Sequence, residues 1–259
     1  MKLMVNHQTH YRYTQTARNS VQSIKMMPQS SQHQTVETWH ISVPGESNCK
    51  RDAFNNLWMT ATQRHDYRYL TIMAQGVIDL HATELGHFES HISPMLFLQR
   101  TTMSCYDSTM LDFAKSIVLR LNRQHLIDLS EAILERVPYQ PQSTSVTTSA
   151  IDAFYAGQGV CQDHAHVFVA MCRALQIPAR YVSGYLYDQN QPHLASHAWA
   201  EAFVDNQWYC FDISNQIFAP QNHIYVAIGR DYLDVAPVRG VREQGGVESM
   251  MSSVQVLAC

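Results

Sequence analysis

The sequence predicts an α+β fold, in which a β-rich N-terminal domain precedes a core of helices packed on an antiparallel sheet. Residues 1–95 alternate between apolar and polar side chains, as half-buried strands do. Helical spacing of apolar residues begins near residue 107, and strand-like runs return after residue 178. A block of helices followed by a block of strands is the order typical of an α+β core. We therefore expect two domains, residues 1–95 and residues 96–259.

The N-terminal domain is expected to form a small β-sandwich or barrel. Turn-forming residues such as Pro28, Pro44-Gly45 and Asn55-Asn56 separate its strand-like runs. The expected strands are Leu3–Tyr13, Val21–Met27, Val36–Val43, Leu57–Ala61 and Tyr67–Leu80. Its aromatic residues are expected in the core, and a role in selecting substrate is the alternative.

The core is expected to begin with helices, after a connection over residues 83–105 that has no clear period. One helix starts at a cap formed by Asp107 or Ser108. A second starts at Asp128, with Glu131 three residues on as in a capping box. The third, Ser149–Ala156, is closed by Gly157, since glycine accepts the left-handed conformation of a helix end. Strands are then expected over 179–187, 196–204, 208–212 and 224–228, with a loop over 233–246 and a closing edge strand over 253–257.

The stretch Gln158–His166 places a cysteine at the start of a buried helix. Gly159 allows a sharp turn just before Cys161, and an apolar run then continues until Pro178 stops the helix. A thiol in the first turn lies beside unpaired backbone N–H groups and the positive end of the helix dipole, and both favour the thiolate. The same N–H groups can stabilise an oxyanion. Cys161 is therefore a predicted nucleophile, with an inert buried thiol as the alternative.

Two later strand-like segments supply a base and an acid. His197 lies in the first, and Asp212 ends the second. A two-residue loop within Asp205-Asn206-Gln207 would place both side chains on one face, whereas a three-residue loop would place them on opposite faces unless a bulge intervenes. Imidazole ionises near neutral pH, so His197 is the predicted base, and Asp212 is predicted to hold its tautomer. Taken singly, each could instead be a structural residue.

These motifs resemble the bacterial transglutaminase-like superfamily, whose members include candidate cysteine proteases. The four core motifs are Gly159–His166, Ile177–Tyr185, His197–Glu201 and Phe211-Asp212. The tail His223–Gly240 and the opening Met1–Pro28 resemble the family too, so the resemblance spans nearly the whole chain. It implies a transglutaminase/papain-like core behind a β-sandwich-like N-terminal region. The family usually has Pro-Thr-Asn after the acid, whereas this chain has Ile213-Ser214-Asn215, so a differently shaped loop is expected there.

The expected chemistry is acyl transfer or hydrolysis at amide bonds of peptides or glutaminyl side chains, through a thioester on Cys161. The resemblance favours a peptidase or amidase over protein cross-linking. Trp199, two residues from His197 and on the same strand face, is a candidate for substrate contact, with a core aromatic as the alternative. Tyr185 and Asp231 are further candidates. Asp163 and His166 are expected to support the site from behind.

No metal or cofactor is expected. A zinc site could in principle be built from Cys161-x-x-His164 with His193 and His197, but neighbouring helical positions point in different directions and no second tight pair follows. The oxygen-rich pattern of a calcium loop is absent. The alternative function is a non-catalytic peptide- or protein-binding module that retains the triad architecture.

Composition limits the partners. The net charge is −4, with 18 Lys+Arg against 22 Asp+Glu and no basic run, so nucleic acid is not expected. The six cysteines lack paired spacing and are expected to be free thiols, with Cys172 and Cys210 in the core. The start lacks the apolar core of a signal peptide, and no stretch is apolar enough to span a bilayer. We therefore expect a cytosolic protein with no membrane partner.

Overall fold

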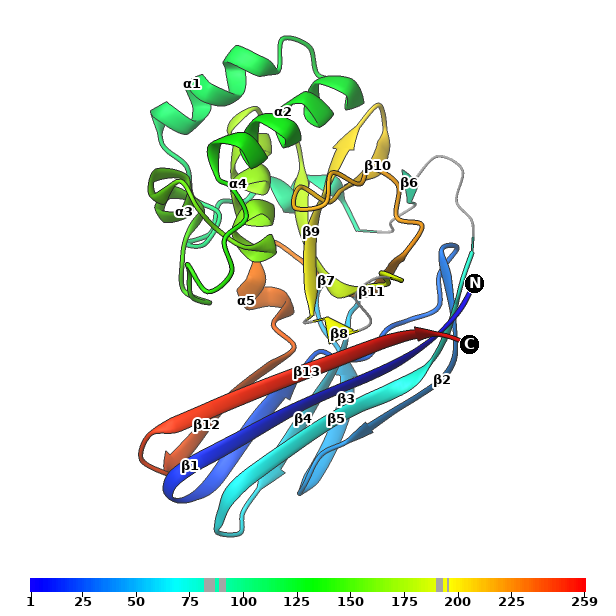
Figure 1. Cartoon of the computed structure of the whole chain (residues 1–259), viewed down its shortest axis with the longest axis vertical. Coiled ribbons are helices and arrows are strands. Elements are labelled where there is room, and N and C mark those ends of the chain that lie inside the picture. Colours follow the sequence, from blue (N-terminus) through cyan, green and yellow to red (C-terminus); the bar gives the residue numbers. More distant parts are fainter. Residues whose placement is uncertain (82–86, 89–91, 190–192, 195) are drawn as a thin grey trace.

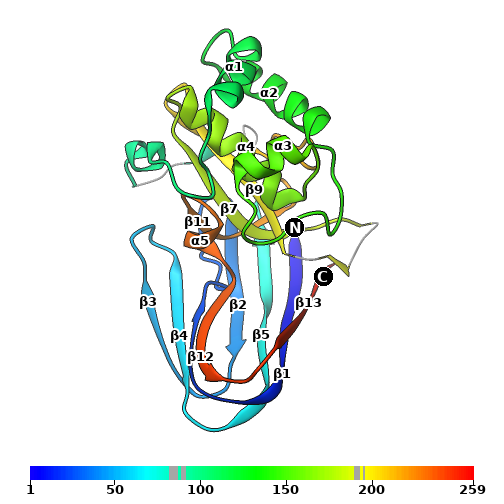
Figure 2. The same cartoon turned by 90° about the vertical axis from the view of Figure 1, so that its left-hand side faces the viewer.

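The α+β prediction is confirmed by the computed structural model shown in Figures 1 and 2, which describes all residues except 82–86, 89–91, 190–192 and 195. A helical layer covers a five-stranded antiparallel sheet, and a larger eight-stranded antiparallel sheet lies at the other end of the molecule (Figure 1). No helix in the described part of the chain combines the length and hydropathy needed to cross a membrane.

The eight-stranded sheet is built around the 23-residue strand β1. Its strands are β1 (Lys2–Ile24), β2 (Gln34–Ser42), β3 (Glu46–Arg51), β4 (Leu57–Gln63), β5 (Tyr67–Leu80), β8 (His193–Leu194), β12 (Val238–Gln244) and β13 (Glu248–Ala258). Residues 3–12 of β1 pair with β5 and β13, and residues 18–24 pair with β12 and β4. The register shifts between these two parts, so β1 joins two groups of strands that enclose a buried cluster containing Ala17, Ile24 and Ile72.

Three strand predictions for this sheet were wrong. Val21–Met27 is not a separate strand, because β1 runs without interruption to Ile24. The strand β12 lies within the expected loop 233–246. Residues 253–257 pair with β1 in this sheet and do not close the core sheet. The division at residue 95 therefore assigns β12 and β13 to the core, although they pair in the N-terminal sheet.

The five-stranded sheet has the order β11 (His223–Gly229), β7 (Ala179–Leu186), β9 (His197–Val204), β10 (Gln207–Phe211), β6 (His87–Phe88). The helical elements are η1 (Pro94–Leu98), α1 (Ser108–Ile117), α2 (Arg123–Arg136), α3 (Ala150–Ala156), α4 (Cys161–Ala174) and α5 (Tyr232–Val235). Helix α4 is buried between the sheet and helices α1 to α3. Its neighbour β9 presents Ala198, Ala200 and Ala202, which are small enough for a helix to approach closely.

The helix caps agree with the sequence in two places and differ in one. Asp107 caps α1, and Gly157 ends α3 with a φ of 66°. The predicted start of α2 at Asp128 was wrong, because the Asn122 side chain accepts a hydrogen bond from the His125 backbone N–H and starts the helix earlier. Cys172 and Cys210 are buried in the core, as expected.

Candidate active site

Gly159 and one buried carboxylate shape the turn before Cys161. A Cβ on Gly159 would lie 2.8 Å from Cβ of Asp163, so only glycine allows this close approach. Asp163 Oδ2 accepts hydrogen bonds from the Val160 backbone N–H at 2.8 Å and from the Thr144 hydroxyl at 2.6 Å. Asp163 therefore supports the backbone directly ahead of the half-buried Cys161, which is the first residue of α4.

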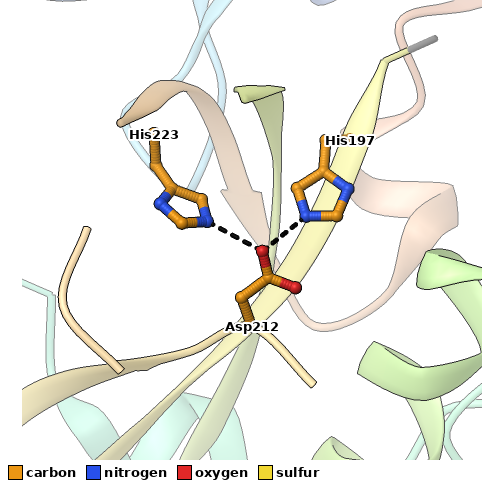
Figure 3. Close-up of side chains that lie close together, drawn as sticks. All are labelled: His197, Asp212 and His223. Atoms are coloured by element: carbon orange, nitrogen blue, oxygen red, sulfur yellow. Dashed lines mark hydrogen bonds and ion pairs between the residues drawn. The ribbon is translucent and has the colours of Figure 1, made fainter. Parts of the chain in front are cut away.

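The β9–β10 hairpin brings the predicted base and acid together. Its loop is the two-residue Asp205-Asn206, with φ of 52° and 61°, as in a type I′ turn. Ala200 pairs with Phe211, so His197 and Asp212 lie on the same face of the hairpin. The His197 Nε2–H donates to Asp212 Oδ2 at 2.8 Å (Figure 3). Of the two loop lengths that the sequence left open, the structure therefore has the two-residue one.

The Asp212 carboxylate receives more than one hydrogen bond. Its Oδ2 accepts from His197, from His223 Nε2 at 3.0 Å and from Asn215 Nδ2 at 2.9 Å, and its Oδ1 accepts from the Asn215 backbone N–H at 3.3 Å. Burial alone would raise the pKa of Asp212, but its imidazole partners lower that pKa well below its usual range. The carboxylate is therefore ionised at neutral pH.

His197 is held between Asp212 and Cys161. Burial would lower the pKa of His197, but the Asp212 charge and hydrogen bond and the hydrogen-bonded Cys161 side chain raise it from 6.5 to about 10. Because Nε2 faces Asp212, the other ring nitrogen, Nδ1, is available to the thiol. The arrangement therefore holds an imidazolium beside a cysteine at a helix start, the environment in which thiols act as nucleophiles.

Ser214 links the loop behind the acid to helix α4. The His164 Nδ1 and the Ser214 hydroxyl are hydrogen-bonded at 2.7 Å, and His164 Nε2 donates to the Val137 carbonyl at 2.7 Å. The loop residue Ser214 thus contacts the helix that carries Cys161. Asn215, the position shared with the family pattern, bonds the acid itself.

The three predicted substrate-contact residues are buried and have partners within the chain. Trp199 is 0% exposed and its ring lies 5.8 Å from that of His197. Tyr185, 2% exposed, bonds His7 Nδ1 through its hydroxyl at 2.9 Å. Asp231, 3% exposed, caps α5 by accepting from the Leu233 backbone N–H at 2.8 Å. Their contact with substrate stays a prediction, and the contacts seen here are structural.

His166 supports α5. The Tyr232 backbone N–H donates to His166 Nε2 at 3.1 Å, and the His166 ring lies 4.9 Å from that of Tyr181. Complete burial lowers the pKa of His166 to about 3, so the ring is neutral. His166 therefore acts as a hydrogen-bond acceptor between α4 and α5.

Two groupings of ligand-type side chains are candidates for a metal site. In the Cys161–His164 grouping, both ring nitrogens of His164 are used by Ser214 and Val137, so neither is available to an ion. The side chain of His193 lies outside the described residues. In the second grouping, ligand atoms of His197, Asp212 and His223 lie within 4.8 Å of one another. Both imidazoles point at the carboxylate oxygen itself (Figure 3), so that oxygen occupies the position an ion would need.

Sequence reasoning missed the roles of His223 and Asn215. His223 opens the tail segment that resembles the family, and Asn215 is the residue of the loop pattern that the chain retains. Their inclusion in family-like segments was the available signal. The spacing of these residues along the chain gave no signal, because His223 reaches Asp212 from a different strand.

The fold is transglutaminase-like. Residues 120–213 match the transglutaminase-like superfamily, and residues 3–79 match the bacterial transglutaminase-like N-terminal region. The chain thus carries both parts that the resemblance implied.

Similar proteins align with this chain over most of their length. An uncharacterized protein of Mycobacterium leprae (ML0607) is 26% identical over 98% of each chain. An uncharacterized protein of Mycobacterium tuberculosis (Rv2569c) is 27% identical over 92% of this chain and 86% of its own. A crystal structure of a candidate cysteine protease from Cytophaga hutchinsonii superposes with a TM-score of 0.80 at 22% identity, covering 99% of this chain and 90% of that one. The last comparison establishes the shared fold.

Proposed function

We propose that this protein is a cysteine-dependent enzyme that hydrolyses or transfers acyl groups at amide bonds of peptides or glutaminyl side chains. The observation that carries the proposal is the arrangement around His197, which has an ionised carboxylate on one side and the Cys161 thiol on the other. A candidate cysteine protease with the same fold supports the choice of a peptidase or amidase over protein cross-linking.

In the proposed first step, the Cys161 thiolate attacks the amide carbonyl and forms a C–S bond. The negative charge that develops on oxygen lies near the first backbone N–H groups of α4, which have no partner within the helix. The imidazolium of His197 then donates its proton to the amide nitrogen, the C–N bond breaks, and ammonia or an amine leaves. A thioester remains on Cys161.

In the second step, water or a second amine attacks the thioester, and neutral His197 accepts its proton. The C–S bond breaks, the thiolate leaves, and the imidazolium is restored. Asp212 stays ionised throughout and keeps Nε2 of His197 protonated, so that Nδ1 exchanges the proton.

The free state of all six cysteines suits a reducing compartment such as the cytosol.

The pH dependence of Cys161 alkylation by iodoacetamide tests this proposal without a known substrate. Peptide mass spectrometry compares Cys161 with the exposed Cys49 in the same sample. We expect Cys161 to react well below neutral pH and His197→Ala to abolish that advantage. If Cys161 reacts with the same pH profile as Cys49, the enzymatic proposal is wrong and the binding-module alternative is favoured.

Loss of the thiol is the complementary test. We expect Cys161→Ala to abolish release of ammonia or amine from any amide substrate that the parent cleaves, with less than about 1 kcal/mol change in the free energy of unfolding, because the residue is only half-buried. Substantial turnover by this variant would refute the thioester mechanism.

A further inference from the structure

The acid of the proposed triad has a second imidazole partner, His223, on the same oxygen as His197. His223 is fully buried at the start of β11, and its Nε2 lies 3.0 Å from Asp212 Oδ2 (Figure 3). Because an ionised carboxylate only accepts, His223 must donate its Nε2–H. Burial lowers the pKa of His223 despite the opposing effect of Asp212, so the ring is neutral.

A neutral His223 has no route for relaying a proton. Its Nδ1 has no hydrogen-bond partner among the described residues and is buried, so a proton there would create an uncompensated charge. The other titratable groups facing it are His197 and Glu201 on β9 and His33 of the N-terminal region. What His223 can do is stabilise the Asp212 anion and fix the oxygen that faces His197.

The position of His223 is set by the N-terminal region through three buried side chains. The His33 Nε2–H donates to the His223 carbonyl at 2.7 Å. The Gln34 amide bonds both backbone groups of Tyr225, donating to the carbonyl at 2.8 Å and accepting from the N–H at 2.8 Å. The Asn56 amide bonds Ile228 in the same way, at 2.8 and 2.9 Å.

Gln34 and Asn56 together form what we call the amide clamp. Strand β11 is the outermost strand of the five-stranded sheet in the described part of the chain, and two amides bonded to its backbone continue the hydrogen-bond ladder as a neighbouring strand would. Gln34 is 1% and Asn56 is 3% exposed, so water does not compete for these bonds. The clamp joins the N-terminal sheet to the strand that carries His223.

We propose that His223 is a positioning residue for Asp212, and that the N-terminal sheet sets its position through His33 and the amide clamp. The inference rests on the proposed function, because Asp212 matters to chemistry only if His197 and Cys161 react. It gives the N-terminal region a part in active-site geometry. Loss of the His223 donor leaves the Asp212 oxygen less well fixed against His197, so the thiolate–imidazolium pair is weakened and the Cys161 thiolate forms only at a higher pH.

The test compares two variants of the full chain that differ in one donor. His223→Leu fills the space without an N–H group, whereas His223→Gln retains a donor near the position of Nε2. In His223→Leu we expect the acid limb of the Cys161 alkylation profile to move to higher pH and the rate at about pH 5 to fall roughly tenfold or more, as for loss of a hydrogen bond to a charged group. We expect His223→Gln to restore most of that rate. Equal losses in both variants, or none in either, would overturn the proposal.

A stability measurement separates this inference from the proposed function. Urea unfolding of His223→Leu, Asp212→Asn and the double variant gives the coupling between the two positions. We expect a coupling of about tenfold or more in the unfolding equilibrium constant, whether or not the thiol reacts. Additive effects would mean that the hydrogen bond does not form. If coupling is found and Cys161 still behaves as an ordinary thiol, the enzymatic proposal alone is wrong.

The amide clamp is tested with a matched control. Gln34→Leu removes both bonds to Tyr225, whereas Gln8→Leu removes an amide of the same sheet that bonds Asn6 and does not contact β11. We expect Gln34→Leu to move the acid limb in the same direction as His223→Leu but less, since Asn56 and His33 remain. Identical profiles for the two glutamine variants would refute the role of the clamp.

Discussion

Asp212→Asn removes the charge that keeps His197 protonated. Burial opposes a charged ring, yet the carboxylate and Cys161 together raise the pKa of His197 from 6.5 to about 10. That rise corresponds to about 5 kcal/mol in favour of the imidazolium. Asp212 supplies the largest of the contributions that raise the pKa, so without its charge we expect burial to prevail, the pKa of His197 to fall to near or below 6.5, and the imidazolium to become the minor form at neutral pH. The asparagine side chain also replaces one acceptor oxygen of the carboxylate by an NH2 group, which is a donor. It therefore cannot accept all the hydrogen bonds that the carboxylate accepts.

We therefore expect Asp212→Asn to lower turnover roughly a hundredfold or more while leaving KM nearly unchanged. The sign of the pH effect follows from the raised pKa. In the parent the imidazolium persists until the pH approaches about 10, whereas in the variant it is lost near or below pH 6.5. Alkylation of Cys161 across the pH range measures this without a substrate, and urea unfolding shows whether the variant is folded. A folded variant with the parent's alkylation profile would refute the assignment of Asp212 as the orienting acid.

Two further predictions concern the surroundings of the site. Gly159→Ala places a methyl group against Asp163, and we expect a loss of about 1–3 kcal/mol in the free energy of unfolding together with slower Cys161 alkylation. Gly157→Ala, strained by its φ of 66° but with no close contact to Asp163, is the control and should lower stability without slowing alkylation. His166 has a pKa of about 3 in the folded protein and about 6.5 when unfolded, so its contribution to stability is complete above pH 6.5 and declines as the pH falls below that value. When the pH is lowered from about 7 to 5, the parent's free energy of unfolding should therefore fall by about 2 kcal/mol more than that of His166→Gln, as measured by urea unfolding. Equal falls in the two proteins would show that the fold does not hold His166 neutral.

Local chemistry was enough to predict the parts of the fold that depend on neighbouring residues. Asp205-Asn206 forms a two-residue turn because both residues tolerate positive φ, and that turn alone determines that His197 and Asp212 share a face. Gly157 ends α3 for the same kind of reason. The start of α2 was missed because its first turn, Arg123–His125, is polar and adds nothing to the apolar period.

The pairing of strands that lie far apart in the chain could not be predicted from the sequence. The residues of β12 carry no alternation of burial, since the strand is stabilised by its partner β1 and not by a buried face of its own. The strand β3 has only exposed side chains and was overlooked for a similar reason. At the site, His223 could not be placed on Asp212 because the bond joins two strands that are not neighbours in the sheet.

The return of β13 to β1 has a consequence for synthesis of the chain. The segment 3–12 pairs on one side with β5, which follows within about 80 residues, and on the other with β13, which is made long after β5. At about 5–20 residues per second, β1 waits on the order of ten seconds or more for that partner. Meanwhile Leu3 and Val5 lack contact with Val254 and Val256, with which they share a buried cluster in the finished molecule. The nascent protein therefore emerges with an apolar strand edge exposed, and a chaperone that binds such edges would act on this one until β13 is made.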